Sequence, residues 1–322
     1  MMRFLRAVAS LRLTSALLLL MGVLAFAGVL APQHADGLIA APLALLACNL
    51  AAAIACRRAL RHGGLGLFHA CLLACILVVA WGRLTHLDGR VRIASGQEFD
   101  AGAVEIHARG RWHGDGLQRL AFRQGPFTVT YGTGIKREHT TSLVALGTEP
   151  GAAWQAIGDD TPLKVDGYRF YTTPNKGFAP VLTWTPAGGE PVTGAVMLPS
   201  YPVSDVQAQQ WEAPGGAAWN FWLRVDKVPE NTAWTLDPSR TPNVLVAESG
   251  SQRFELKPGE EARIAQGTLR YEWLSGWMGY RIFYDPTLLP LLALALLAVA
   301  GLAWHLWARS LQSLAATEAV PA

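Results

Sequence analysis

Long apolar runs and one long polar stretch divide the 322-residue chain. Three apolar runs follow one another near the N-terminus, and a fourth lies near the C-terminus. Each is close to the roughly 20 residues that cross a bilayer as an α-helix. The pattern therefore predicts an integral membrane protein with four transmembrane helices, at residues 13–31, 38–56, 65–82 and 286–308.

The polar stretch between the third and fourth runs, residues 84–285, is long enough to bury a core of its own. Val, Thr, Tyr and Trp are frequent there, and turn residues recur at short intervals. The pair Asp166-Gly167, between two β-rich segments, is a strong hairpin signal. We expect an all-β domain, a sandwich or open barrel of two sheets, in which residues 204–213 have a pattern that suits a short helix.

The arginines near the apolar runs are distributed unevenly. They precede the first run, lie between the second and third, and follow the fourth at Arg309, whereas the loop between the first and second runs has no Lys or Arg. Arg83, directly after the third run, is the single exception. Lys and Arg are enriched in the cytoplasmic loops of membrane proteins. We therefore expect residues 1–83 to form an N-terminal membrane region and residues 309–322 a short cytoplasmic tail. Both termini are then cytoplasmic and the β-rich domain is extracytoplasmic.

Composition argues against several classes of function. The net formal charge is +3, but the polar stretch by itself is slightly acidic, so nothing indicates a nucleic-acid partner. The β-rich domain has no cysteine and no recognisable catalytic motif. The apolar runs contain no Asp, Glu, Lys or Arg, which argues against an ion-coupled transporter.

One histidine lies inside the third apolar run, in the segment GLGLFHACLLACILVVAWG: it is His69. An imidazole in hydrocarbon loses its water, which costs free energy unless another group binds the ring. Neutral imidazole is a good ligand for transition metals such as iron. His69 is therefore a candidate metal ligand, and a hydrogen bond between helices is the alternative. Cys71 and Cys75, on one helix face, are interpreted as small packing residues.

His305, in the segment LAWHLWARS, is the second candidate ligand. It lies near the end of the fourth run, where a ring can keep contact with water, so we interpret it as an interfacial residue. A cluster of aromatic residues precedes the fourth run, and we interpret it as an interfacial belt. Its members are Trp273, Trp277, Tyr280, Phe283 and Tyr284.

Three further segments are informative as a set. They are ASLRLTSALLLLMGVLAFAGVLAPQ (residues 9–33), TPLKVDGYRFYTTPNKGFAPVLTW (161–184) and GTLRYEWLSGWMGYRIFYDPTLLPLLALALLAVAGL (267–302). In this order, with three spans before a large outer domain and one after it, the chain resembles the ResB-like (CcsB) family of cytochrome c biogenesis proteins. It departs from the family pattern at Thr287, where Gly is usual, and at Thr172, where Gln is common.

The resemblance implies a role in system II cytochrome c maturation at the bacterial cytoplasmic (inner) membrane. Family members pair with a ResC-type (CcsA) membrane protein, carry haem b transiently across the membrane and deliver it to apocytochrome c. A histidine of the third span is implicated in the family as an axial ligand of the haem iron, and His69 matches that position. The resemblance thus implies a non-autonomous subunit of a cytochrome c haem lyase.

The loop before the third run supplies candidate partners for the haem propionates. Guanidinium groups bind carboxylates in two-pronged geometry, and three arginines lie within about three helical turns of His69. They are Arg57, Arg58 and Arg61. The alternative function is a non-catalytic membrane assembly or scaffold protein, in which the β-rich domain docks a partner complex and His69 only donates a hydrogen bond between spans.

Overall fold

The structure, a computed structural model, describes residues 7–30, 35–147, 149, 151–226, 228, 229 and 231–318, without the side chains of 29, 35–40 and 313–318. The chain divides into two compact units. The helical unit comprises Met1–His86, Arg109–His113 and Asp285–Ala322, and the β unit comprises Leu87–Ala108 and Gly114–Tyr284. The short segment 109–113 thus belongs with the helices, although it lies inside the stretch expected to be all-β.

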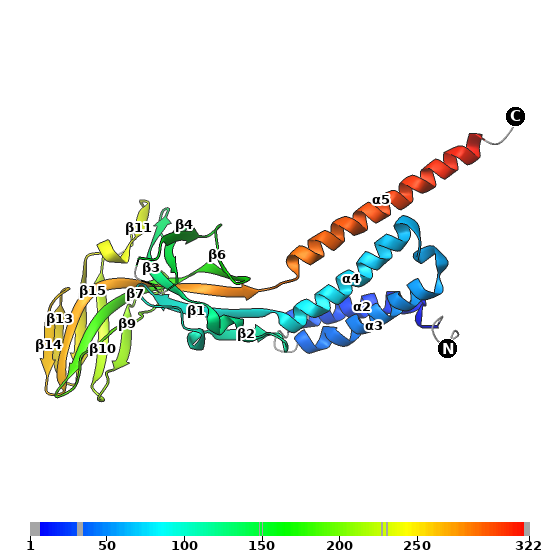
Figure 1. Cartoon of the computed structure of the whole chain (residues 1–322). Coiled ribbons are helices and arrows are strands. Elements are labelled where there is room, and N and C mark those ends of the chain that lie inside the picture. Colours follow the sequence, from blue (N-terminus) through cyan, green and yellow to red (C-terminus); the bar gives the residue numbers. More distant parts are fainter. Residues whose placement is uncertain are drawn as a thin grey trace. The chain divides into compact units, whose positions relative to one another are not determined.

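The helical unit contains the long helices in Figure 1: α2 (Leu11–Leu30), α3 (Ala35–Cys56), α4 (Gly63–Thr85) and α5 (Leu288–Glu318). In the described part of the chain α2, α4 and α5 are long and apolar enough to cross a membrane, whereas the apolar helix described within α3, Ala41–Cys56, is shorter. Helix α5 runs past the expected end at residue 308. Just before α5, the Asp285 carboxylate accepts the backbone N–H of Thr287 at 2.8 Å, and the Thr287 carbonyl oxygen accepts the helical N–H of Leu291 at 2.9 Å, so Thr287 is at the N-cap position.

The β unit lies between α4 and α5 in the sequence and is rich in strands, as expected. Its strands are β1 (Leu87–Ala94), β2 (Glu105–Arg109), β3 (Phe122–Tyr131), β4 (Arg137–Leu146), β5 (Trp154–Gly158), β6 (Leu163–Val165), β7 (Tyr168–Pro186), β8 (Val192–Ala195), β9 (Ala208–Glu212), β10 (Ala218–Val225), β11 (Trp234–Leu236), β12 (Asn243–Ser249), β13 (Gln252–Leu256), β14 (Glu261–Ile264) and β15 (Gly267–Tyr284).

Two long strands, β7 and β15, form the centre of the β unit. They pair antiparallel from Gly267 opposite Pro186 to Tyr284 opposite Tyr168. The largest sheet has the order β2-β1-β15-β7-β6, with β14 added to β15 and β8 added to β7. Two further sheets have the orders β11-β3-β4-β5 and β13-β12-β10-β9. The described strands therefore form three sheets rather than the expected two, because each smaller sheet packs on a different half of the β7–β15 pair.

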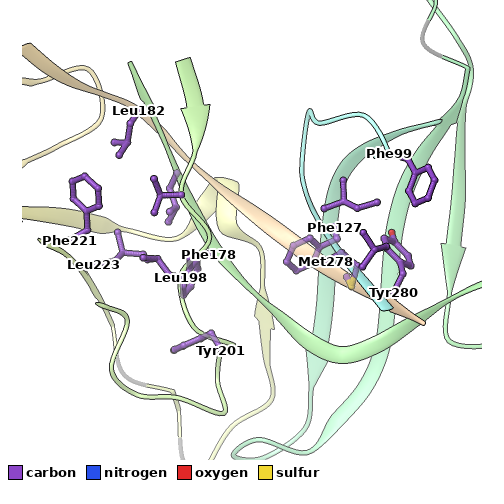
Figure 2. Packing of buried hydrophobic residues seen from close by; sticks show 14 of the residues in the cluster. Phe99, Phe127, Phe178, Leu182, Leu198, Tyr201, Phe221, Leu223, Met278 and Tyr280 are labelled. Atoms are coloured by element: carbon purple, nitrogen blue, oxygen red, sulfur yellow. The ribbon is translucent and has the colours of Figure 1, made fainter. Parts of the chain in front are cut away.

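The buried side chains of the β unit fall into two groups in Figure 2. Phe127 and Tyr280 lie in the group formed with β3 and β4, and Leu182 and Phe221 lie in the group formed with β10. All four are at most 2% exposed. Burial of aromatic and aliphatic side chains of this size contributes about 2 kcal/mol each, so the packing of both groups stabilises the β7–β15 pair.

The Asp166-Gly167 hairpin is confirmed. Val165 of β6 pairs directly with Tyr168 of β7, and both turn residues have positive φ, 48° and 83°. A two-residue turn with positive φ at both positions is type I′, whose twist matches that of the strands. The prediction of a short helix at 204–213 is wrong, because residues 208–212 pair with β10 as strand β9.

The interpretation of the aromatic cluster as an interfacial belt is wrong for Trp277 and Tyr280. Each is 1% exposed and belongs to the core of the β unit. The Trp277 indole Nε1 donates to the carbonyl of Leu198 at 2.8 Å, and the Tyr280 hydroxyl donates to Gln124 Oε1 at 2.6 Å. Their polar atoms are therefore bonded inside the protein rather than at a lipid surface.

Candidate functional site

The N-terminal end of α4 is shaped by a tight connection from α3. A short 3-10 helix, Arg58–Leu60, follows α3, and His62 is the N-cap of α4. Gly63 has φ +63°, a left-handed conformation that favours glycine. A Cβ on Gly66 would come within 2.7 Å of the carbonyl carbon of Arg61, so the backbone of Arg61 lies directly against α4 at this point.

His69 is half-buried on the second turn of α4. Its Nδ1 lies 2.8 Å from the carbonyl oxygen of Leu65, one turn earlier. A carbonyl oxygen only accepts hydrogen bonds, so Nδ1 carries the proton in this contact, and Nε2 of the neutral ring keeps its lone pair. Metal-ligating histidines have the same arrangement, with one N–H on a backbone carbonyl and the other nitrogen free to coordinate. The ring of Phe68 packs edge-on at 5.3 Å between centroids.

The position of His69 around the axis of α4 decides which other groups could bind the same molecule as this ring. Gly64, Cys71 and Gly82 are buried on the stripe of α4 nearest α5, and a Cβ on Gly64 would come within 2.3 Å of the Gly301 oxygen. At about 100° per residue, His69 lies roughly 140° from Gly64 around the helix axis. It lies only about 60° from Gly66, and therefore on the side of α4 that carries the Arg61 backbone.

His305 lies at the crossing of α4 and α5. A Cβ on Gly64 would come within 2.6 Å of the His305 backbone nitrogen, and the His305 side chain is half-buried. His69 is five residues further along α4, about 7.5 Å, and on the side away from α5. Of the two histidines, His305 is therefore the one at this crossing of the helices.

The three arginines differ in their contacts. The Nη2 of Arg57 donates to the carbonyl oxygen of Ala9 at 3.3 Å, which fastens the end of α3 to the residues before α2. Arg58 and Arg61 are exposed on the 3-10 helix and at its end. Arg61 is the one whose backbone packs on the His69 side of α4, so it is the best placed of the three to share a ligand with that ring.

A buried amide joins α2 to α3 and was missed by the sequence analysis. Asn49, 2% exposed, accepts the hydroxyl proton of Thr14 at 2.7 Å through Oδ1. Its Nδ2 donates to the carbonyl oxygens of Ser10, at 3.3 Å, and Val8. An amide inside an apolar run is itself a signal, because it needs partners when it is removed from water. These contacts give Asn49 a structural role.

The other end of α4 is covered by the segment 109–113, which was also missed. The backbone N–H of Gly110 donates to the His86 oxygen at 2.8 Å, and that of Trp112 donates to the Leu84 oxygen at 2.7 Å. The Nδ1–H of His113 donates to the Thr85 oxygen at 2.7 Å. The last carbonyls of a helix lack partners within the helix, so this segment satisfies three of them.

Within the described residues, no group of three or more His, Cys, Asp or Glu side chains is placed to hold a metal ion. A haem needs only one or two axial ligands from protein, because the porphyrin supplies the other four. With Nδ1 bonded to Leu65, the Nε2 of His69 on the apolar helix α4 could serve as one such ligand.

Comparison with known proteins gives one assignment. The model of the ResB-like family matches residues 49–313, which is well over half of the chain. The match includes α4 with His69, the whole β unit and the apolar part of α5 up to residue 313. No curated protein matches the chain. The chain belongs to the ResB-like family, which is associated with cytochrome c biogenesis.

Proposed function

We propose that this chain is the ResB-type subunit of a system II complex that exports haem and attaches it to apocytochrome c, with haem as its cargo. Family membership supports the link to cytochrome c biogenesis. The observation that carries the finer proposal is the hydrogen bond from His69 Nδ1 to the Leu65 oxygen, which leaves Nε2 as an iron ligand. It occurs on a helix that is apolar and long enough to cross a membrane.

The proposed setting is the bacterial cytoplasmic membrane, with both termini in the cytoplasm and the β unit outside. Exposed tryptophans support the placement. Trp81 and Trp112 lie at one end of α4, and Trp304 and Trp307 lie near the crossing with Gly64 at the other. These ends are about 25 Å apart along α4, close to the thickness of a bilayer core, and tryptophan is enriched at both edges of that core.

In this proposal the chain binds and orients its cargo. His69 supplies one axial ligand about six residues, or 9 Å, from the start of α4. Arg61, with Arg58 beside it, binds propionate groups at the cytoplasmic edge. The second axial ligand comes from the CcsA-type partner, because His69 lies on the side of α4 away from the crossing that contains His305. The partner also supplies the outer site at which haem joins apocytochrome c, so the chain is not an enzyme by itself.

The test is the absorption spectrum of the chain co-expressed with a CcsA-type partner and purified in detergent. We expect a low-spin Soret band that is lost or much weakened in His69→Gly and restored by added imidazole, which replaces the missing ring. His107→Ala, at an exposed histidine of β2, serves as the matched control. A His69→Gly complex with the Soret band of the unchanged protein would refute the ligand assignment.

One observation favours the second candidate function, a membrane scaffold. The bond to Leu65 already satisfies Nδ1 within α4, so the half-buried ring needs less compensation from iron than a fully unpaired one. A scaffold predicts normal haem loading in the His69→Gly complex, and normal cytochrome c levels in a strain that lacks the chain.

A further inference from the structure

A cleft lies between α3 and α4 at the end of α4 away from His69. Its volume is about 540 Å³. The walls inside the helical unit are apolar, and small residues make the space: Ala44 and Ala47 come from α3, and Ala80 comes from α4. Ile76 and Leu77 of α4 also line it. A groove of this kind between two helices fits a chain of methylene groups.

The mouth of the same cleft is cationic. It is lined by Arg83, His86, Arg109 and Arg111, and none of the described residues that line the cleft is acidic. Arg109 is held in place by a bond from its Nη2 to the His113 oxygen at 3.1 Å, and Arg111 is exposed. Guanidinium groups bind phosphate oxygens through charge-assisted hydrogen bonds.

Two tryptophans indicate the depth of this mouth in the membrane. Trp81 and Trp112 are exposed and pack edge to face, with centroids 6.3 Å apart. Each lies within a few residues of an arginine of the mouth. Since tryptophans concentrate at the edge of the hydrocarbon layer, the arginines lie at headgroup depth and the small-residue groove lies at acyl-chain depth. This step rests on the membrane placement in the proposed function.

We propose that the cleft binds an anionic phospholipid of the outer leaflet. The phosphate lies among the arginines of the mouth, and one acyl chain runs down the groove between α3 and α4. The charge of the mouth complements an anion, and the groove complements its tail. The bound lipid then contacts α3, α4 and the segment 109–111 together, and so holds that segment on the end of α4.

The separation of polar and apolar residues along the cleft favours a lipid over haem. The imidazole of His86 lies at the mouth among the arginines, not on the apolar wall, and its Nδ1 bonds to the Arg83 oxygen at 3.0 Å. A haem ligated there would have its iron among charged groups, while the groove beside the alanines stayed empty. A phospholipid fills both parts.

Native mass spectrometry of the full chain in mild detergent, titrated with phosphatidylglycerol, tests the proposal. We expect defined lipid adducts whose apparent affinity falls about tenfold in Arg109→Gln/Arg111→Gln, because charge-assisted hydrogen bonds are lost. Arg90→Gln/Arg92→Gln, which removes the same charge from β1, is the matched control. Ala44→Leu/Ala47→Leu, which fills the groove and keeps every arginine, should also lose the adduct.

Three outcomes would overturn the proposal. Equal lipid affinity in Arg109→Gln/Arg111→Gln and in Arg90→Gln/Arg92→Gln would show that the lipid is adventitious. Unchanged binding in Ala44→Leu/Ala47→Leu would show that no chain enters the groove. Displacement of the lipid by millimolar inorganic phosphate would assign the mouth to a free anion. The Soret band of the complex is expected to be unchanged in these variants, so a failure of the lipid site and a failure of the haem proposal can be told apart.

Discussion

Gly64 of α4 lies in direct contact with the backbone of His305 of α5. A Cβ at Gly64 would come within 2.6 Å of the His305 nitrogen, and one at Gly301 would come within 2.9 Å of the Gly64 oxygen. Side-chain carbons essentially never approach backbone atoms so closely. The crossing of α4 and α5 therefore depends on a glycine in each helix, as in other apolar helix pairs that associate through small residues.

Gly64→Ala should disrupt this crossing. The added methyl group collides with backbone atoms that cannot rotate away, so the helices must separate, which costs about 1–3 kcal/mol. We expect a clearly lower midpoint of thermal unfolding in detergent, followed by tryptophan fluorescence. Gly22→Ala in α2 is the matched control, because no atom lies within 4 Å of its Cβ position. Equal midpoints for the two variants would contradict the packing described for Gly64.

Gly110→Ala should detach the segment 109–113 from α4. A Cβ there would come within 2.4 Å of both the carbonyl carbon and oxygen of Leu84, so the bonds from Gly110 and Trp112 to the helix end cannot both persist. We expect faster amide hydrogen exchange at these two residues and faster proteolysis of the segment. Gly114→Ala, where the Cβ position is open and φ is −76°, should leave both rates unchanged.

The apolar runs predicted the helices well, because length and hydropathy are local properties. Helix α4 begins two residues before the expected span at 65 and ends three after the expected 82. The Asp166-Gly167 turn was also predictable, because both residues tolerate positive φ. The strand at 208–212 was not, because it exists only through pairing with β10.

The sequence predicted that His69 lies within an apolar helix, but it did not predict which groups surround the ring. Its bond to Leu65 depends on the rotamer of the side chain, and its orientation away from α5 depends on the glycine contacts of Gly64. Likewise, the burial of Tyr280 depends on Gln124, 156 residues away in the chain. Contacts of that range leave no local pattern, which is why Trp277 and Tyr280 were misread as part of a membrane belt.

A closed ring of hydrogen bonds lies in the core of the β unit, and Tyr280→Phe tests it. Tyr280 donates to Gln124 Oε1 at 2.6 Å, Gln124 Nε2 donates to Ser142 at 2.8 Å, and Ser142 lies 2.9 Å from the Tyr280 hydroxyl. Removing the hydroxyl leaves two buried polar groups short of a partner, so we expect about 1–3 kcal/mol lower stability. Tyr171→Phe, at a tyrosine that is only half-buried on β7, should change little.

Lys176 of β7 is an unusual buried cation. Its side chain is fully buried, and its Nζ has no hydrogen-bond partner among the described residues. Burial lowers the pKa of Lys176 to about 8, Arg137 lowers it as well, and Asp159 opposes both effects. The ordinary pKa of 10.5 applies to the unfolded chain, so the folded state binds this proton less readily than the unfolded state.

Stability should therefore depend on pH in a way that Lys176→Met removes. Between pH 8 and 10.5 the unfolded chain holds more protons, so the free energy of unfolding rises with pH, whereas below pH 8 the whole cost of burying the charge remains. We expect Lys176→Met to stabilise the protein at pH 7 by about 1–3 kcal/mol and to flatten the rise above pH 8. Thermal unfolding in detergent at a series of pH values measures both. Lys164→Met, at an exposed lysine of β6, should keep the rise, and identical pH curves for the two variants would show that the buried ammonium does not cause it.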